Sequence, residues 1–229
     1  MKNLFLSIFV ITTLNAAGQD HIIGVKAGVN WTNASTDFLS HTDYRTGVTT
    51  GLTYEYLFNR FFSVGADFSY NQRGFTTDLF FANSVWPFAL QSQTIKYNYN
   101  YLSLPLKAGL NIGNKLYGFM NIGAVPSLLV KARTMRPIFN ANGEKTGNET
   151  FDATSIVKKL DFAGLAEIGA GYKIDGRFRL YTSFAYQRSF TTITNSEYFS
   201  GSKIEHYGMT LVLGLKYTLP KQTREQTKE

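Results

Sequence analysis

The 229-residue chain contains no cysteine, only five prolines and few charges, with 17% of its residues charged. An average globular protein has about 25%. Without cysteine, a disulfide scaffold and a thiolate metal site are excluded. The chain also lacks an uninterrupted apolar run of about 18 residues, which argues against a bundle of transmembrane helices.

Aromatic side chains are abundant, at 15% of residues, which excludes a disordered chain. The length suits one domain. The mean hydropathy is close to neutral at −0.14, although 44% of residues are hydrophobic. Two classes remain, a soluble β-rich domain and a transmembrane β-barrel. A membrane barrel combines apolar lipid-facing side chains with a polar interior, so it fits this composition better.

The net charge is +7, from 23 lysines and arginines against 16 acidic residues. The basic residues are scattered rather than gathered into a run or a basic helix. The sequence therefore predicts no nucleic-acid partner. A solvated surface accounts for the excess, with attraction to anionic lipid headgroups as the alternative.

Residues 1–18 have the pattern of a secretory signal peptide. An apolar stretch over Leu4–Leu14 is followed by the small residues Ala16 and Gly18, which predicts cleavage before Gln19. The apolar stretch is too short to span a membrane as a helix. We therefore expect an exported protein.

Period-two alternation dominates the rest of the chain, which predicts β-strands. In residues 205–219, Tyr207 and Tyr217 bracket an apolar stripe that alternates with small or polar residues. Aromatic side chains on both sides of an apolar band are typical of two membrane interfaces. The same pattern predicts strands at about 23–31, 48–56, 62–71, 102–112, 116–130, 161–172 and 178–187.

The connections between these eight strands alternate in length. Tight turns are predicted at Leu57–Phe61, Gly113–Lys115 and Lys173–Gly176, and long connections at 32–46, 74–96, 132–159 and 190–203. The prediction is an eight-stranded antiparallel transmembrane up-and-down β-barrel with short periplasmic turns and long extracellular loops. The barrel would comprise residues 19–219, followed by a disordered polar tail at 220–229.

The face opposite the apolar stripes carries nine charges, five positive and four negative, and many glycines. The charges are Lys26, Glu55, Asp67, Arg73, Lys107, Asp161, Glu167, Arg179 and Lys216, and the glycines are Gly24, Gly28, Gly51, Gly65, Gly109, Gly169, Gly171, Gly208 and Gly214. An eight-stranded barrel is only wide enough for its own side chains. We expect a filled lumen in which these charges pair, with a proton or ion path as the alternative.

Four segments resemble the PorT-like outer-membrane β-barrel family of Bacteroidetes-type bacteria. They are Gly24–Asn30, Gly51–Gly74, Tyr101–Leu110 and Lys159–Ile174. The third contains the family's Tyr-Leu-x-Ile-Pro-Leu step, with Leu104 at the isoleucine position, and we expect its Pro105 to form a local bulge. The resemblance implies an outer-membrane barrel. Founding members are linked to type IX protein secretion, so an accessory role in secretion is one implied function.

Catalytic and metal-binding motifs are sparse. The three histidines, His21, His41 and His206, have no metal-ligand spacing, and no nucleophile elbow or phosphate loop occurs. His206 with Glu205 or Ser202, near the extracellular rim, is the one arrangement that a rim hydrolase could use. We predict no catalytic, cofactor-binding or metal-binding residue, and therefore a protein that is not an enzyme.

Two of the long connections have unusual compositions. The first, 74–96, is rich in apolar residues, namely Phe75, Leu79, Phe80, Phe81, Val85, Trp86 and Phe88. It is either an extension of two strands that pack on each other or a partner-binding or lipid-facing surface. The second has a basic excess that could meet lipopolysaccharide phosphates, with Arg133, Arg136, Lys145, Lys158 and Lys159 against Glu144, Glu149 and Asp152.

The predicted function is a structural, adhesive or partner-binding role at the surface of the outer membrane. An accessory role in type IX secretion and a narrow channel for ions or small solutes are the alternatives. The predicted partners are outer-membrane lipid and lipopolysaccharide, with envelope or secretion proteins as further candidates. We expect a monomer without a cofactor.

Overall fold

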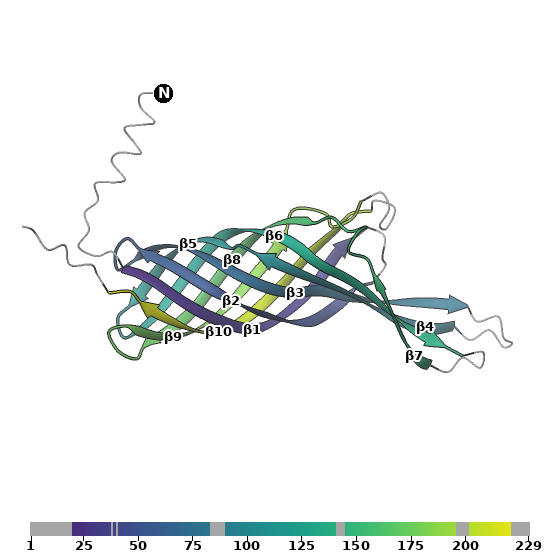
Figure 1. Cartoon of the computed structure of the whole chain (residues 1–229), viewed down its shortest axis with the longest axis horizontal. Helices are drawn as coiled ribbons and strands as arrows, with labels where there is room; N and C mark the ends of the chain where they lie inside the picture. The colour runs from purple at the N-terminus through teal and green to yellow at the C-terminus, as the bar shows by residue number, and fades with distance from the viewer. Residues whose placement is uncertain are drawn as a thin grey trace, which may run out of the picture.

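The computed structural model describes residues 20–37, 39, 41–82, 90–140, 145–195 and 202–220. The predicted signal peptide and nearly all of the predicted tail lie outside these residues. The described strands are β1 (Asp20–Thr36), β2 (Asp43–Leu57), β3 (Phe62–Ala82), β4 (Leu90–Ser103), β5 (Leu106–Gly113), β6 (Leu116–Phe139), β7 (Lys145–Asp152), β8 (Leu160–Lys173), β9 (Phe178–Ser189) and β10 (Ile204–Thr218) (Figure 1). No helix in this part of the chain is long and apolar enough to cross a membrane.

The strands close into a ring, because β1 pairs with β2 on one side and with β10 on the other. Every pairing is antiparallel, and the order around the ring is β1, β2, β3, β4 with β5, β6, β8, β9 and β10. β4 and β5 together form one strand of the ring, while β7 pairs with β6 outside it. The ring therefore has eight strands, which confirms the predicted barrel.

The interruption between β4 and β5 lies at Leu104–Pro105, where the sequence predicts a bulge. The Leu104 N–H donates to the Pro126 carbonyl at 2.9 Å, and the Pro105 carbonyl accepts from the Asp67 N–H at 2.9 Å. Proline lacks an N–H donor, but its two neighbouring strands remain hydrogen-bonded across the interruption. The irregularity is local and leaves the ring closed.

The pairing register determines how far the strands tilt. A row of paired residues followed once around the ring runs through Tyr207, Arg188, Gly164, Ala124, Leu106, Ala66, Tyr54 and Ile23 and returns to β10 at Tyr217. The row returns 217 − 207 = 10 residues further along β10. A stagger of ten residues over eight strands corresponds to a tilt of about 40°.

The apolar face of the strands points outward. In β10, Leu211 and Leu213 are 44% and 60% exposed, whereas Val212 between them is 5% exposed and Lys216 is 8% exposed. A soluble ligand-binding barrel would have the reverse arrangement, with its apolar face toward the lumen. The outward apolar face is that of a membrane barrel.

Aromatic rings mark both ends of the apolar band. At one end, the rings of Phe178 and Tyr217 are 5.1 Å apart, and at the other, the rings of Tyr44 and Tyr207 meet edge to face at 5.8 Å. Such girdles form where a barrel meets the two membrane interfaces. The predicted role of Tyr207 and Tyr217 as interface residues therefore agrees with their positions.

The three tight turns lie where the sequence predicts them, at one end of the barrel. The Asn59 side chain accepts from the Phe61 and Phe62 N–H groups at 2.8 and 2.9 Å. Gly113 ends β5 with a φ of 109°, a left-handed conformation that suits glycine. We call this end the turn end, and the opposite end, where β3, β4, β6 and β7 extend (Figure 1), the hairpin end.

The third turn makes a prediction about acid. The N–H groups of Phe178 and Arg177 donate to the Asp175 carboxylate at 2.6 and 2.7 Å and hold its pKa below the ordinary value. A depressed pKa stabilises the fold above the unfolded-state pKa of about 4 and ceases to do so as the pH falls through the folded-state value. We expect Asp175→Ala to lower the urea midpoint more at pH 7 than at pH 3. An equal loss at both pH values would contradict this role, and Asp175→Asn, which keeps an acceptor, is the control.

Most of two long connections is itself strand. β3 continues to Ala82 and β4 begins at Leu90, while β6 continues to Phe139 and β7 occupies Lys145–Asp152. The alternative in which the apolar segment 74–96 extends two strands is therefore confirmed for its described parts. Val85, Trp86 and Phe88 lie outside the described residues.

Candidate functional site

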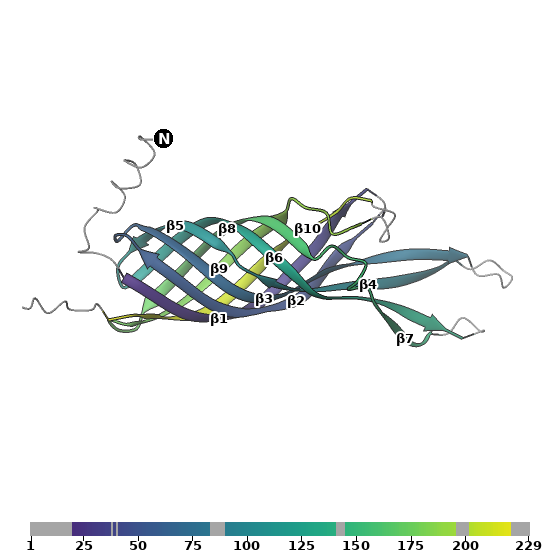
Figure 2. The same cartoon turned by 45° about the horizontal axis from the view of Figure 1, so that its top comes forward.

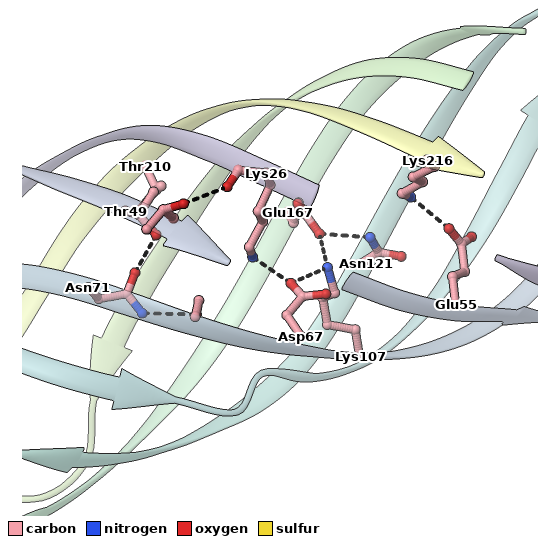
Figure 3. Close-up of polar contacts among 12 residues, drawn as sticks. Lys26, Thr49, Glu55, Asp67, Asn71, Lys107, Asn121, Glu167, Thr210 and Lys216 are labelled. Carbon is pink, nitrogen blue, oxygen red and sulfur yellow. Dashed lines mark hydrogen bonds and ion pairs between the residues drawn. The ribbon is translucent and has the colours of Figure 1, made fainter. Parts of the chain in front are cut away.

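The middle of the lumen is occupied by a cluster of ion pairs. Asp67 lies 2.6 Å from the Lys26 ammonium and 2.8 Å from that of Lys107, and Lys107 lies 3.2 Å from Glu167. The Asn121 amide also donates to Glu167 at 2.8 Å. Figure 3 shows these side chains converging from several strands across the interior. Two lysines and two carboxylates thus neutralise each other inside the barrel.

A second pair of contacts lies toward the turn end. Lys216 lies 2.6 Å from Glu55 (Figure 3), and its ammonium stands 4.5 Å from the centre of the Tyr181 ring. Arg179 lies 3.7 Å from Asp20. Cation–π contacts of this kind are stronger away from water, so the Tyr181 ring helps to hold the Lys216 ammonium in the interior.

A third group lies toward the hairpin end and centres on Arg73 and Asp161, which are 2.8 Å apart and almost wholly buried. Arg73 also donates to the hydroxyls of Ser103 and Ser127 at 3.3 and 3.2 Å. Asp161 accepts from the Thr191 hydroxyl at 2.9 Å. Because Thr191 follows β9, this carboxylate ties the β9–β10 connection to the barrel wall.

All nine charges that the sequence places on the inner face form ion pairs in the lumen. Asp20 is a tenth, which the sequence analysis missed because it precedes the first predicted strand. With it the set is balanced, five positive charges (Lys26, Arg73, Lys107, Arg179, Lys216) against five negative (Asp20, Glu55, Asp67, Asp161, Glu167). The prediction of a filled lumen with paired charges is confirmed.

Aromatic and aliphatic side chains close the lumen at the hairpin end. Phe75 stacks on Tyr97 at 4.6 Å, and Tyr99 and Tyr101 are buried in the same cluster. Val157 and Ile193 of the long connections pack in this cluster, together with Ile204, the first residue of β10. We call this cluster the aromatic cap.

A smaller ring cluster fills the lumen at the turn end, formed by Tyr117, Phe119, Tyr181 and Val212. The rings fit because glycines face them. A Cβ atom on Gly171 would collide with the Tyr117 ring, and one on Gly214 with the Tyr181 ring. These contacts explain two of the glycines on the inner face and show why that face cannot carry larger residues there.

The possible catalytic group at the rim is not assembled. His206 is buried under the aromatic cap, with its ring 5.0 Å from that of Tyr99. Glu205, its neighbour on the other face of β10, pairs with Lys203 at 2.9 Å. Ser202 contributes its carbonyl oxygen to a hydrogen bond from the Thr194 hydroxyl. The three residues of this possible group therefore have separate partners or surroundings.

The other two histidines lie apart from each other. His21 Nδ1 is 2.8 Å from the Tyr54 hydroxyl on the outer face, and His41 is 3.3 Å from Asp43 in the β1–β2 connection. In the described part of the chain, no three His, Cys, Asp or Glu residues are grouped so that they could hold a metal ion.

Two hairpins project beyond the rim at the hairpin end. β4 and β6 pair as far as Lys96 and Met135, and beyond this point the β3–β4 and β6–β7 hairpins separate (Figure 2). Within the described residues β7 pairs with β6 alone, so its other edge is open. On one face of this hairpin, Ile138 and Phe151 are 44% and 56% exposed.

The basic excess predicted for the third long connection is partly neutralised. Arg136 pairs with Glu149 at 2.7 Å, and Lys131 lies 3.9 Å from Asp152. Lys158 is exposed beside the rim, as is Lys159. Glu144 lies outside the described residues.

A match to a family model supports this architecture. A family model described as "outer membrane protein beta-barrel domain" matches residues 18–220. Among curated proteins no match is found. Similar solved structures include Ail of Yersinia pestis, with 16% identity over 87% of this chain and 99% of that chain and a TM-score of 0.42.

Two further barrels are similar at the same level. OprG of Pseudomonas aeruginosa is 12% identical over 90% of this chain and 97% of that chain, with a TM-score of 0.48. The outer membrane protease OmpT of Escherichia coli is 9% identical over 90% of this chain and 100% of that chain, with a TM-score of 0.44. Because the family model spans the whole ring of strands, the chain belongs to the outer membrane protein β-barrel domain family, and its place is the outer membrane.

Proposed function

We propose that this protein is a non-enzymatic barrel with a closed lumen, whose role at the cell surface is to bind a partner protein through the β6–β7 hairpin. The observation that carries the proposal is the open edge of β7 over Lys145–Asp152, held beyond the rim of a barrel whose interior is filled. The proposal assumes export after removal of residues 1–18 and a mature barrel of residues 19–219.

The open edge supports strand addition by a partner. An unpaired strand edge presents a row of N–H and C=O groups that an extended segment of another chain can pair with. Natural proteins protect such edges with proline, bulges or charged side chains, and β7 carries three charges, Lys145, Glu149 and Asp152, of which the last two pair with residues of β6. β7 contains no proline, and its pairing with β6 is regular between Asp152 and Gly147, with a register shift only near the tip. The edge is therefore open to a partner strand.

The hairpin face beside that edge has the composition of a protein interface. Ile138 pairs with Gly147, Arg136 with Glu149, and Thr134 with Phe151, so these residues share one face of the hairpin. The side chains of Ile138 and Phe151 therefore lie on either side of the Arg136–Glu149 ion pair. Protein interfaces combine apolar and aromatic anchors with arginine. Exposure of these two apolar side chains to water is unfavourable, and a bound partner would remove it.

The filled lumen argues against the alternative of a narrow channel. The six ion pairs and the aromatic cap occupy the interior, and an eight-stranded barrel has no spare width. The separate surroundings of His206, Glu205 and Ser202 support the proposal that the protein is not an enzyme.

Photo-crosslinking in intact cells tests the proposal. A photoreactive amino acid at Asn148, which is exposed on β7, is expected to give a discrete protein adduct, because a partner strand would lie against it. The matched control is the same residue at Ile112, 69% exposed at the turn end, which is expected to give no such adduct. A second variant joins Met135 to Thr150, which are paired, through Asn-Gly in place of residues 136–149.

This shortened barrel is expected to fold, as judged by its altered migration when unboiled in SDS. It is expected to lose binding of the partner protein, because it lacks residues 136–149. Adducts absent from Asn148, or equally abundant at Ile112, would overturn the proposal.

The resemblance of Gly51–Gly74 and Lys159–Ile174 to the PorT-like family favours one particular partner class. If the adduct is a type IX secretion component, the accessory role in secretion is the specific form of this function.

A further inference from the structure

Arg188 is a charged residue on the lipid-facing side of β9. Along this strand Ala185 and Ser189 are buried, at 8% and 2% exposure, whereas Tyr186 and Phe190 are 42% and 65% exposed. Arg188 is exposed and lies between these two aromatic residues on the same face. The other arginine in the wall part of β9, Arg179, points into the lumen and pairs with Asp20.

The height of Arg188 follows from the register. It pairs with Tyr207 of β10, a residue of the aromatic girdle at the hairpin end, and with Gly164 of β8. Ten residues separate it from Phe178 in the opposite girdle. At about 3.3 Å per residue and a tilt of about 40°, this distance is about 25 Å along the barrel axis, the thickness of the apolar band of an outer-membrane barrel. Arg188 therefore lies where the outer leaflet's headgroups begin.

Arg188 makes no ion pair or hydrogen bond within the described residues, whereas every charge in the lumen is paired. A guanidinium at the edge of the hydrocarbon is costly unless an anion accompanies it. Phosphate is its best-matched anion, because the planar donor fork binds two phosphate oxygens at once.

An apolar hollow on the outer wall reaches Tyr186, the residue that precedes Arg188 on the same face of β9. One part, of about 650 Å³, is lined by Gly164, Val64, Ala108 and Ile122. A second part, of about 790 Å³, shares the last three of these residues and extends past Ala166 and Tyr186 toward the turn end. The hollow is lined by the small residues Ala108 and Ala166 between larger side chains such as Leu110 and Ile168.

We propose that Arg188 and this hollow form a binding site for an outer-leaflet lipid whose headgroup carries a net-anionic phosphate monoester. The lipid phosphate would accept hydrogen bonds from the guanidinium, and an acyl chain would lie along Tyr186, Ala166 and Ala108. Charge complementarity at the upper end and the apolar lining below it select a lipid over a second copy of the barrel. The site is separate from the β7 edge and does not depend on the proposed partner protein.

Native mass spectrometry of the purified, folded protein tests the site. The probes are a bisphosphorylated glucosamine lipid of the lipid A type, its dephosphorylated form and phosphatidylcholine. We expect the phosphorylated lipid to bind, and Arg188→Gln to weaken its binding about tenfold, the effect of about 1.4 kcal/mol expected for a charge-assisted hydrogen bond. Arg177→Gln, on the periplasmic turn, is the matched control and should bind like the wild type.

A second variant tests the hollow without changing the charge. Ala166→Phe fills it and is expected to weaken binding of the same lipid while the barrel stays folded on unboiled gels. Inorganic phosphate at equal concentration should not displace the lipid, because it lacks the acyl chain. Wild-type affinity in Arg188→Gln, equal binding of phosphatidylcholine, displacement by inorganic phosphate, or a dimer that Ala166→Phe abolishes would each overturn the lipid site.

Discussion

Lys107→Met is expected to lower the free energy of unfolding by about 3–5 kcal/mol, because removing one partner of a buried ion pair leaves uncompensated charge in the interior. Lys107 bridges Asp67 and Glu167, at 2.8 and 3.2 Å. Without it, Asp67 retains Lys26, but Glu167 keeps the amide of Asn121 and loses its ion-pair partner. The measurement is a urea titration of the folded barrel in detergent micelles, followed by tryptophan fluorescence.

Two controls separate this loss from a general effect of the substitution. The double variant Lys107→Met/Glu167→Gln restores the charge balance and should recover part of the stability. Lys203→Met removes an exposed lysine that pairs with Glu205 at 2.9 Å, and exposed pairs contribute at most about 1 kcal/mol. If Lys107→Met and Lys203→Met had equal effects, the lumen cluster would not stabilise the barrel as argued.

Asp161→Asn is expected to destabilise the barrel by a similar amount, about 3–5 kcal/mol, and also to loosen the β9–β10 connection. The substitution preserves the shape of the side chain but leaves the buried Arg73 without a counter-charge. Asp161 also accepts from Ser189 and Thr191, so the connection at 190–203 loses an anchor to the wall.

Limited proteolysis of the protein in liposomes detects the second effect. The variant should be cleaved within residues 190–203 faster than the wild type. Glu149→Gln is the matched control, because it makes the same carboxylate-to-amide change in an exposed ion pair with Arg136. Unchanged cleavage together with unchanged urea stability would show that the Arg73–Asp161 pair is dispensable.

The strands of the barrel wall could be predicted from the sequence because lipid and lumen impose opposite polarity on alternate residues. In β10, for example, Leu211 and Leu213 face lipid and Val212 is buried. Above the membrane this constraint ends. The residues of β3 beyond Phe75 and of β6 beyond Thr134 therefore lack clear alternation, and the sequence analysis treated them as connections although they are strands.

The upper half of β4 shows a second reason why the predicted and observed strand bounds differ. Tyr97, Tyr99 and Tyr101 point inward and form the aromatic cap, whereas Leu104 is 43% exposed toward lipid. The apolar face changes sides near Tyr101, because the interior is apolar at the cap and charged below it. The alternation of apolar residues on one face therefore stops at this change, and a strand predicted from that alternation ends there.

The inner-face charges could be predicted from alternation alone, but their partners could not. Lys216 meets Glu55 and Arg73 meets Asp161 only because the strands are staggered by ten residues around the ring. The burial of His206 could have been predicted from the alternation pattern. It occupies an even position in 205–219, the same face as Gly208 and Thr210, which the sequence analysis assigned to the interior.

The central claim is that the barrel is closed and acts through its outer surfaces. Conductance of the folded protein in a planar lipid bilayer tests it most directly, using protein that migrates differently on SDS gels before and after boiling. The ion pairs and the aromatic cap predict no conductance steps above those of the protein-free bilayer. Defined, reproducible steps from the folded protein would contradict the closed lumen and restore the narrow channel as the function.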